Sequence, residues 1–202
     1  MSKLDMTPMY VMHDALRREL EHLAKATARM TGDPRRVLAA AAGWELFKKS
    51  LHIHHTSEDD ALWPVMRETL ASRPDDLALL NAMEEEHAAV DPIIEAIDSG
   101  TDPLGDLVDA LTTALTAHLK HEEKEALPLM EATLTLEQFQ HFGQVHGSRV
   151  GPDGPRIFPW LLDGASDEVT AKMLAALPDP VRATFETDWR PAYNALDRWA
   201  TS

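Results

Sequence analysis

The sequence predicts an all-α protein, an up-down four-helix bundle followed by a C-terminal extension of short helices. Apolar residues recur with a period near 3.6 in four long segments, roughly 8–30, 34–71, 74–98 and 103–132. None of these segments shows the period-2 alternation of a β-strand. Helix-start and helix-stop residues separate the segments and leave only short connections between them. Long helices with short connections are typical of an antiparallel bundle.

Prolines and capping residues mark the boundaries of the predicted helices. Asp33 followed by Pro34 predicts an N-cap and a first helical residue, and Gly100 predicts the end of the third segment. Thr135 and Gln138 have the spacing of a capping box, which predicts a fifth helix. The bundle is therefore expected to occupy residues 1–132.

Residues 133–202 form the predicted extension, which we expect to pack on the bundle or to form an interface, such as that of a homodimer. A Gly/Pro-rich segment at 151–155 predicts a loop. Large aromatic side chains then follow at intervals, and we expect them to anchor the extension by packing. They are Phe158, Trp160, Phe185, Trp189, Tyr193 and Trp199.

Composition excludes several classes of function. None of the 202 residues is cysteine, which excludes disulfides, thiolate metal sites, iron–sulfur clusters and thiol nucleophiles. A net charge of −15 disfavours binding to nucleic acid. No apolar stretch approaches the length of a membrane span, and the first residues lack the pattern of a signal peptide. We therefore expect a cytoplasmic protein without nucleic-acid or membrane partners.

A ligand motif occurs twice. His54 and Glu58 in the second segment, and His118 and Glu122 in the fourth, both have the spacing His-x-x-x-Glu. Side chains four residues apart on a helix are offset by only about 40° around its axis, so each pair reaches one point. Imidazole and carboxylate together suit iron, manganese or zinc.

The apolar pattern predicts which side of the second segment faces the core. The stripe through His54 and Glu58 is otherwise apolar, whereas the neighbouring stripe through His55 and Asp59 is polar. We therefore expect His54 and Glu58 to point inward, and His55 and Asp59 to point to water. In the fourth segment, the stripe through His118 and Glu122 is likewise more apolar than that of its rival pair, His121 and Glu125.

Two single histidines complete the predicted cluster. His13 in the first segment and His87 in the third each replace an apolar residue on a core-facing stripe. Burying an unpaired carboxylate costs several kcal/mol, so either a cation neutralises the glutamates or they are protonated. The predicted metal ligands are His13, His54, Glu58, His87, His118 and Glu122.

These residues resemble the signature of the hemerythrin-like (HHE cation-binding) family, which has a histidine on each helix and His-x-x-x-Glu on the second and fourth. The resemblance covers residues 8–132, and the chain looks like a member with a C-terminal extension. It implies two iron ions bridged by carboxylates and by an oxo or hydroxo group. It also implies a small-molecule ligand such as O2, H2O2 or NO.

The sequence departs from the oxygen-carrying hemerythrins in two places. Those proteins have His-x-x-x-His on the third helix, whereas this chain has Asp91 at the position of the second histidine. They also have a carboxylate five residues after the fourth-helix histidine, where Glu123 stands here, although Glu122 fits the inward stripe better. With one imidazole fewer, we expect more open coordination positions. We expect Asp91, Asp59 and Glu123 outside the ligand set, and Glu86 in a solvated acidic run.

Three functions follow from this pattern. The first is a di-iron protein that reacts with a small oxidant, by peroxide decomposition or oxygen activation, with catalase-like or oxidase-type activity. The second is a protein that binds or senses oxygen or nitric oxide, or handles iron, without turnover. The third is a helical scaffold with vestigial ligands. The sequence singles out no separate catalytic acid or base, although His141 and His146 lie where the extension could cover the bundle mouth.

Overall fold

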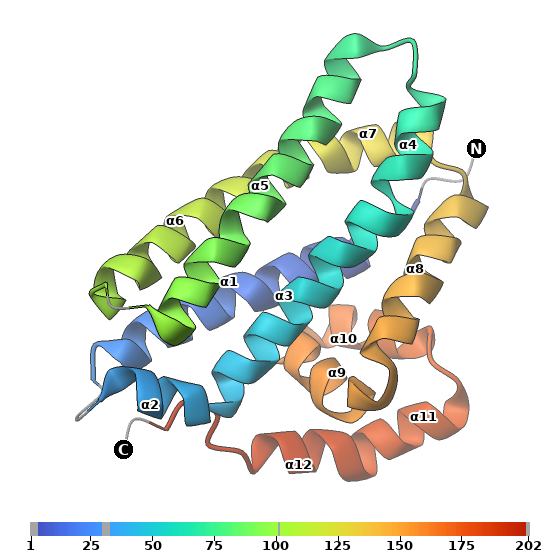
Figure 1. Cartoon of the computed structure of the whole chain (residues 1–202). Coiled ribbons are helices and arrows are strands. Elements are labelled where there is room, and N and C mark those ends of the chain that lie inside the picture. The colour runs from blue at the N-terminus through green and yellow to red at the C-terminus, as the bar shows by residue number, and fades with distance from the viewer. Residues whose placement is uncertain (1–3, 30–32, 101, 201–202) are drawn as a thin grey trace.

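The computed structural model describes residues 4–29, 33–100 and 102–200, and all regular structure in these ranges is helical. Figure 1 shows four long helical arms running side by side, which confirms the predicted all-α bundle. α1 packs against α3 and α6, and α5 also packs against α3 and α6, so that the arms form a closed ring. The arms comprise α1 (Thr7–Thr27); α2 (Pro34–Ala40), α3 (Ala42–Ala61) and α4 (Trp63–Thr69); α5 (Pro74–Ser99); and α6 (Leu104–His121) with α7 (Leu127–Thr133).

Prolines shape the second and fourth arms. Each was predicted as one long segment, with Pro64 and Pro128 expected to bend or end the helix. The second arm breaks at Ala41 and again at Leu62, and the fourth widens into a π-helical turn, Glu122–Ala126. Proline lacks an N–H group and clashes with the carbonyl four residues earlier, which favours a break or a change of register before it, although α5 continues through Pro92. The break at Leu62 precedes Pro64, and the π-helical turn precedes Pro128. π-Helical turns within helices are frequent at functional sites.

Two predicted caps are confirmed. The Asp33 side chain accepts a hydrogen bond of 3.1 Å from the backbone N–H of Arg35. Thr135 and Gln138 form both bonds of the capping box, at 3.2 and 2.8 Å. These bonds satisfy N–H groups that a helix start otherwise leaves without partners.

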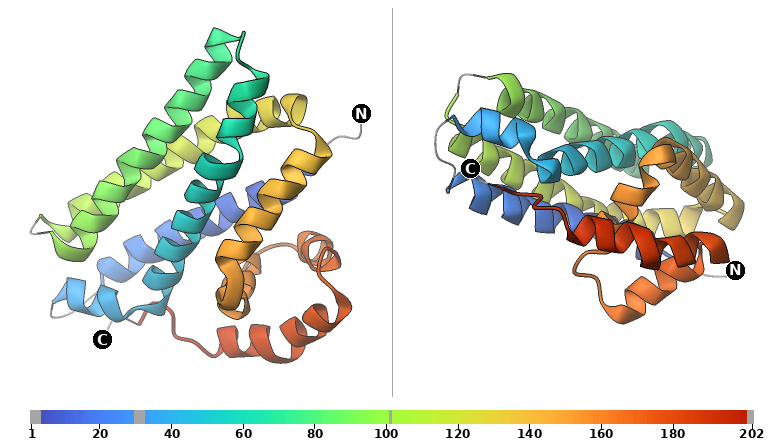
Figure 2. Two further views of the ribbon diagram at one scale, coloured as in Figure 1. Left: turned by 45° about the vertical axis from the view of Figure 1, so that its right-hand side comes forward. Right: turned by 90° about the horizontal axis from the view of Figure 1, so that it is seen from below.

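The residues beyond the bundle form a curved series of short helices that lies against α1 and α3 (Figures 1 and 2). α8 packs on α3, and α9 packs on both α1 and α3. The Gly/Pro-rich segment predicted as a loop is instead a 3-10 turn. Gly151 ends α8 with a positive φ of 45°, and the chain continues through the turn directly into α9. The series comprises α8 (Leu136–Val150), a 3-10 turn (Gly151–Asp153), α9 (Gly154–Leu162), α10 (Asp167–Ala175), α11 (Asp179–Thr184), a π-helical turn (Phe185–Trp189) and α12 (Arg190–Asn194).

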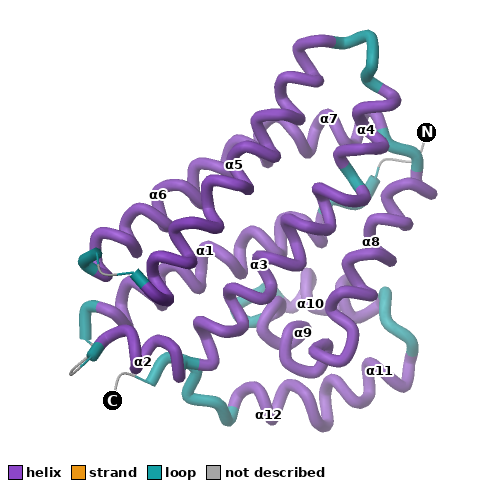
Figure 3. Tube along the Cα trace, viewed as in Figure 1, coloured by secondary structure: helices purple, strands orange, loops and turns teal. Residues whose placement is uncertain are grey.

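The end of this series returns to the bundle and lies against the start of α3 (Figure 3). The backbone N–H of Gly43 donates to the carbonyl of Arg198 at 2.8 Å. The Trp199 indole donates to the fully buried Glu19 carboxylate at 2.8 Å. No helix among the described residues is long and apolar enough to span a membrane.

Gly43→Ala is expected to lower the free energy of unfolding by about 1–3 kcal/mol, because a buried acceptor loses its partner. A methyl group at position 43 would overlap the Trp199 ring, and moving the ring breaks its bond to Glu19. Chemical denaturation measures the change. Gly105→Ala is the matched control, because a methyl group there meets open space. Equal stabilities of the two variants would contradict this account.

Candidate metal centre

The structure brings all six predicted ligand residues together inside the bundle. Each side chain belongs to a residue that is 3% exposed or less. His13 comes from α1, His87 from α5, and the two His-x-x-x-Glu pairs from α3 and from the junction of α6 with the π-helical turn. Four separate arms therefore converge on one buried polar region.

This polar region separates two apolar clusters of the core. In every arm, the ligand residues are flanked on one side by a member of the first cluster and on the other by a member of the second. The apolar layers above and below exclude water from the region, which strengthens any electrostatic interaction within it. The flanking pairs are Met9 and Leu16, Leu51 and Leu62, Met83 and Val90, and Leu115 and Ala126.

The buried histidines and glutamates form two sites, each with three potential ligand atoms within 4.8 Å of one another. The first site, His13, His54 and Glu122, joins α1, α3 and the π-helical turn. The second site, His55, His87 and His118, joins α3, α5 and α6. The cluster thus has the residue types and the spacing to hold two cations.

Glu58 and Glu122 each lie between the two sites. Oxygen atoms of Glu58 are 3.6 Å from Nδ1 of His54 in the first site and 3.5 Å from Nε2 of His87 in the second. One oxygen of Glu122 is 3.1 Å from Nε2 of His13 and 3.8 Å from Nε2 of His118. Both carboxylates are therefore placed to contact a cation in either site.

The polar pattern around His55 predicted that this residue points to water, and the prediction is wrong. It is only 5% exposed and stacks on His87 with ring centroids 3.9 Å apart. Successive residues are about 100° apart around a helix, so Glu58 lies between His54 and His55 on the side of α3 that faces the bundle axis. The buried arc is wider than the single stripe used for the prediction. Trp44 and Leu62, apolar residues on the His55 side, were the signal that could have revealed it.

Three carboxylates outside the two sites orient the histidines. Nδ1 of His13 is 2.9 Å from Glu123, Nδ1 of His87 is 2.8 Å from Asp59, and Nδ1 of His118 is 2.9 Å from Glu86. An Nδ1–H that donates to a carboxylate leaves the Nε2 lone pair facing the cluster, which is the usual arrangement around metal-bound histidine.

These contacts settle the position of the remaining acids and histidines. Asp59 and Glu123 contact the outer nitrogens of His87 and His13 and belong to neither three-residue group, while Glu86 is not merely part of a solvated run. Asp91 is exposed, one helical turn beyond His87. His141 is also exposed, whereas His146 is partly buried beside the bundle.

Seven buried atoms of this cluster have no well-directed hydrogen bond among the described residues, although one oxygen of Glu122 lies 3.1 Å from Nε2 of His13. They are the Nε2 atoms of His55, His87 and His118 and all four carboxylate oxygens of Glu58 and Glu122. Buried polar atoms are nearly always paired, so such a concentration needs an explanation. Three lone-pair donors and two carboxylates fit a pair of divalent cations well.

The pKa shifts of the buried groups indicate how the cluster is protonated when no cation is bound. Burial, reinforced by the neighbouring Glu122, raises the pKa of Glu58 well above its usual range. Burial lowers the pKa of His13, but Glu122 and Glu123 outweigh it and raise the pKa to about 9. Burial raises the pKa of Glu122, but His13 outweighs it and the net pKa is lowered. One glutamate therefore keeps its proton, while the other is paired with a protonated imidazole.

Burial also determines the state of the other histidines. It lowers the pKa of His55 well below the usual value, and the adjacent His87 lowers it further. Burial, together with the nearby His13, also lowers the pKa of His54 well below the usual value. Neutral imidazole is the form that binds metals.

Comparison with known families agrees with the geometry. The family model described as the hemerythrin HHE cation binding domain matches residues 7–130, which contain every residue of both sites. Comparisons with curated proteins and with solved structures found no match. A match over more than half of the chain shows membership, and the protein belongs to the hemerythrin HHE cation-binding family.

Proposed function

We propose that the protein is a non-heme di-iron protein that reacts with a small oxidant. The observation that supports this proposal is the set of seven buried nitrogen and oxygen atoms without a well-directed hydrogen bond, which lie in and between the two adjoining sites. His13 and His54 would hold one iron, and His55, His87 and His118 would hold the other. Glu58 and Glu122 would bridge the two.

The chain supplies orientation and charge compensation. Glu123, Asp59 and Glu86 fix the ring orientation of three histidines. Two carboxylates in an apolar interior offset the positive charge of the cations, which they do more strongly there than in water. When bound, the iron supplies Lewis acidity and electrons that the side chains lack. Peroxide decomposition or oxygen activation is the reaction class that we propose.

His55 also supports a second candidate function. The sequence predicted one imidazole fewer than in the oxygen-carrying hemerythrins, because Asp91 replaces a histidine on the third helix. His55 brings the number of clustered imidazoles to five, so the expectation of more open coordination positions loses its basis. Reversible binding or sensing of oxygen or nitric oxide is therefore the alternative.

Iron loading followed by addition of hydrogen peroxide separates these candidates. We expect about two irons per chain by elemental analysis and the near-ultraviolet charge-transfer bands of a bridged diferric centre. Repeated evolution of oxygen from peroxide indicates an enzyme, whereas a stable colour change without turnover indicates a binding protein. A chain that retains less than about half an iron after gentle purification contradicts both.

Glu86→Gln is expected to weaken iron binding about 10–100-fold, because the carboxylate orients His118 and increases its basicity. Asp91→Asn on the same helix is the control and should leave affinity unchanged, since Asp91 is exposed. Competition with a chelator of known affinity measures both values. Similar affinities for the two variants would show that the outer carboxylate has no influence on the ligand.

A further inference from the structure

An apolar chamber of about 350 Å³ lies where the C-terminal helices meet the bundle. Its walls come from α1, α3, α8, α9, α10, α11 and the π-helical turn that ends at Trp189. Figure 1 shows why so many elements contribute, since the C-terminal series curves around the α1–α3 face. The volume falls within the range of pockets that bind small organic molecules.

The chamber reaches the metal centre. His54 lines it and also belongs to the first metal-ligand site. Met9 and Met12, which precede His13 on α1, line it as well. A molecule in the chamber would therefore contact a proposed iron ligand directly.

The lining determines which molecules fit. No Asp, Glu, Lys or Arg is among the described residues that line the chamber, and the titratable side chains there are His54 and His146. A charged molecule would lose its hydration without gaining an opposite charge, which is unfavourable. An uncharged, largely apolar molecule loses little and buries its surface.

Two glycines of α8, both exposed, line the chamber. Gly143 and Gly147 line it one helical turn apart, and a Cβ added at either would meet no atom within 4 Å. Glycine within a helix destabilises it by about 1 kcal/mol relative to alanine. The helix thus forgoes stability at two positions that both border the chamber.

His146 supplies one polar contact. It lies on the same helix, is partly buried, and has no hydrogen-bond partner among the described residues, although its ring contacts Phe142. A ring nitrogen without a partner in the protein is free to exchange a hydrogen bond with a bound molecule. A single hydroxyl-type oxygen on the bound molecule would provide that partner.

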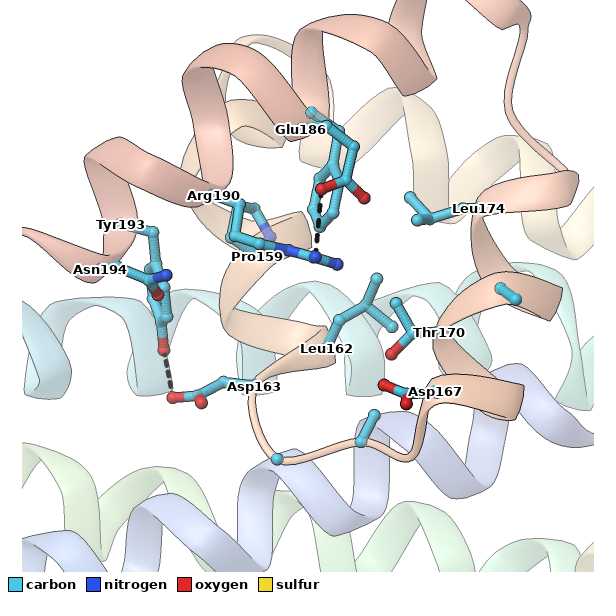
Figure 4. Close-up of a pocket in the computed structure, with 14 residues that line it drawn as sticks. Pro159, Leu162, Asp163, Asp167, Thr170, Leu174, Glu186, Arg190, Tyr193 and Asn194 are labelled. Carbon is cyan, nitrogen blue, oxygen red and sulfur yellow. Dashed lines mark hydrogen bonds and ion pairs between the residues drawn. The ribbon is translucent and has the colours of Figure 1, made fainter.

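A second cavity in the C-terminal helices, about 400 Å³, differs in this respect. Figure 4 shows that four of its polar groups already form two pairs. The Tyr193 hydroxyl donates to Asp163 at 3.0 Å, and Arg190 pairs with Glu186 at 3.1 Å. It has no comparable unpartnered group next to the metal centre.

We infer that the C-terminal helices build a binding chamber for an uncharged, largely apolar organic molecule with one hydroxyl-type end, which His146 recognises beside His54. Gly143 and Gly147 set the width of this chamber. Its influence on iron rests on the proposed function, whereas binding itself does not. The extension thereby holds a small apolar substrate or effector beside the proposed oxidant-reactive site.

Binding is tested with the uncharged dye N-phenyl-1-naphthylamine, whose fluorescence rises in apolar sites, on the full chain with and without iron. We expect saturable binding by one dye per chain and displacement by 1-decanol. Decanoate, with the same chain length and a negative charge, should compete at least about tenfold less well. Absent dye binding, or equal competition by decanol and decanoate, overturns the inference.

Variants locate the binding site. Gly147→Phe should fill the chamber and weaken dye binding at least about tenfold, while Gly105→Phe on α6, also facing open space, should not. Gly143→Leu is a second filling variant if Gly147→Phe lowers the melting temperature. His146→Phe should weaken decanol binding more than dye binding. Unchanged affinity in both filling variants contradicts the assignment.

The iron-loaded protein links the chamber to the metal centre. Decanol should shift the near-ultraviolet bands of the wild type but not those of the filling variants. If the protein holds no iron, the proposed function fails while dye and decanol binding still stand. If iron is present and decanol binds without shifting the bands, the link between chamber and iron is refuted.

Discussion

Replacing His55 with alanine is expected to remove about half of the iron from the proposed two-iron centre. His55 belongs to the site that also contains His87 and His118, and its Nε2 atom is buried without a hydrogen-bond partner. Losing one of three imidazoles leaves that site with two, while the first site keeps all its side chains. Elemental analysis after gel filtration measures the loss, and the charge-transfer bands expected of the proposed bridged pair should bleach.

His52→Ala is the matched control, because His52 lies one turn away on α3 and is exposed. It should keep the full iron content and an unchanged spectrum. Full iron retention in His55→Ala would instead mean that the buried ring has a packing role against His87. Comparing the two variants thus tests whether His55, which was predicted to face water, contributes to iron binding.

Glu58→Gln will leave the metal-free protein nearly as stable as the wild type but will remove most of the stability gained from iron. Burial and Glu122 raise the pKa of Glu58, so without a cation this group is already a neutral acid, which glutamine imitates. A ligand at about 1,000 times its Kd adds about 4 kcal/mol, which for a chain of this size corresponds to roughly 8–16 °C in Tm. The variant should lose most of that gain, because glutamine cannot supply a bridging carboxylate.

Calorimetry measures the melting temperatures of the metal-free and iron-loaded forms, for both the wild type and Glu58→Gln. Glu68→Gln is the control, because Glu68 is exposed on α4, and both its melting temperatures should match the wild type. A full iron-dependent gain in Glu58→Gln would show that Glu58 does not bridge. A large fall in the metal-free melting temperature would show that Glu58 is ionised even without iron.

Much of the fold could be predicted because its signals are local. The capping box at Thr135 and the cap at Asp33 depend on side chains two or three residues from the groups they bind, so spacing alone reveals them. The breaks before Pro64 and Pro128 were harder to predict. Proline excludes a regular helix, but the packing around it decides whether the chain bends, breaks or widens into a π-helical turn.

The ligand cluster illustrates the same limit. An isolated histidine on an apolar stripe, such as His13 or His87, could be predicted as inward-facing because its neighbours on that face are all apolar. His55 could not be assigned in this way, since polar residues such as Asp59 share its side of α3. Asp59 is itself partly buried because it bonds His87 of a neighbouring helix, a contact that the periodicity of one helix does not contain.

The sequence by itself determined the helical class, the places where most arms begin and end, and six polar side chains that must share an apolar interior. These properties depend on the period of a helix and on the cost of burying charge. The tertiary structure alone decided that His55 joins the second site, that three outer carboxylates orient the imidazoles, and that the extension encloses an apolar chamber at His54. Each of these depends on which face of one helix meets another, and residues far apart in the chain determine that jointly.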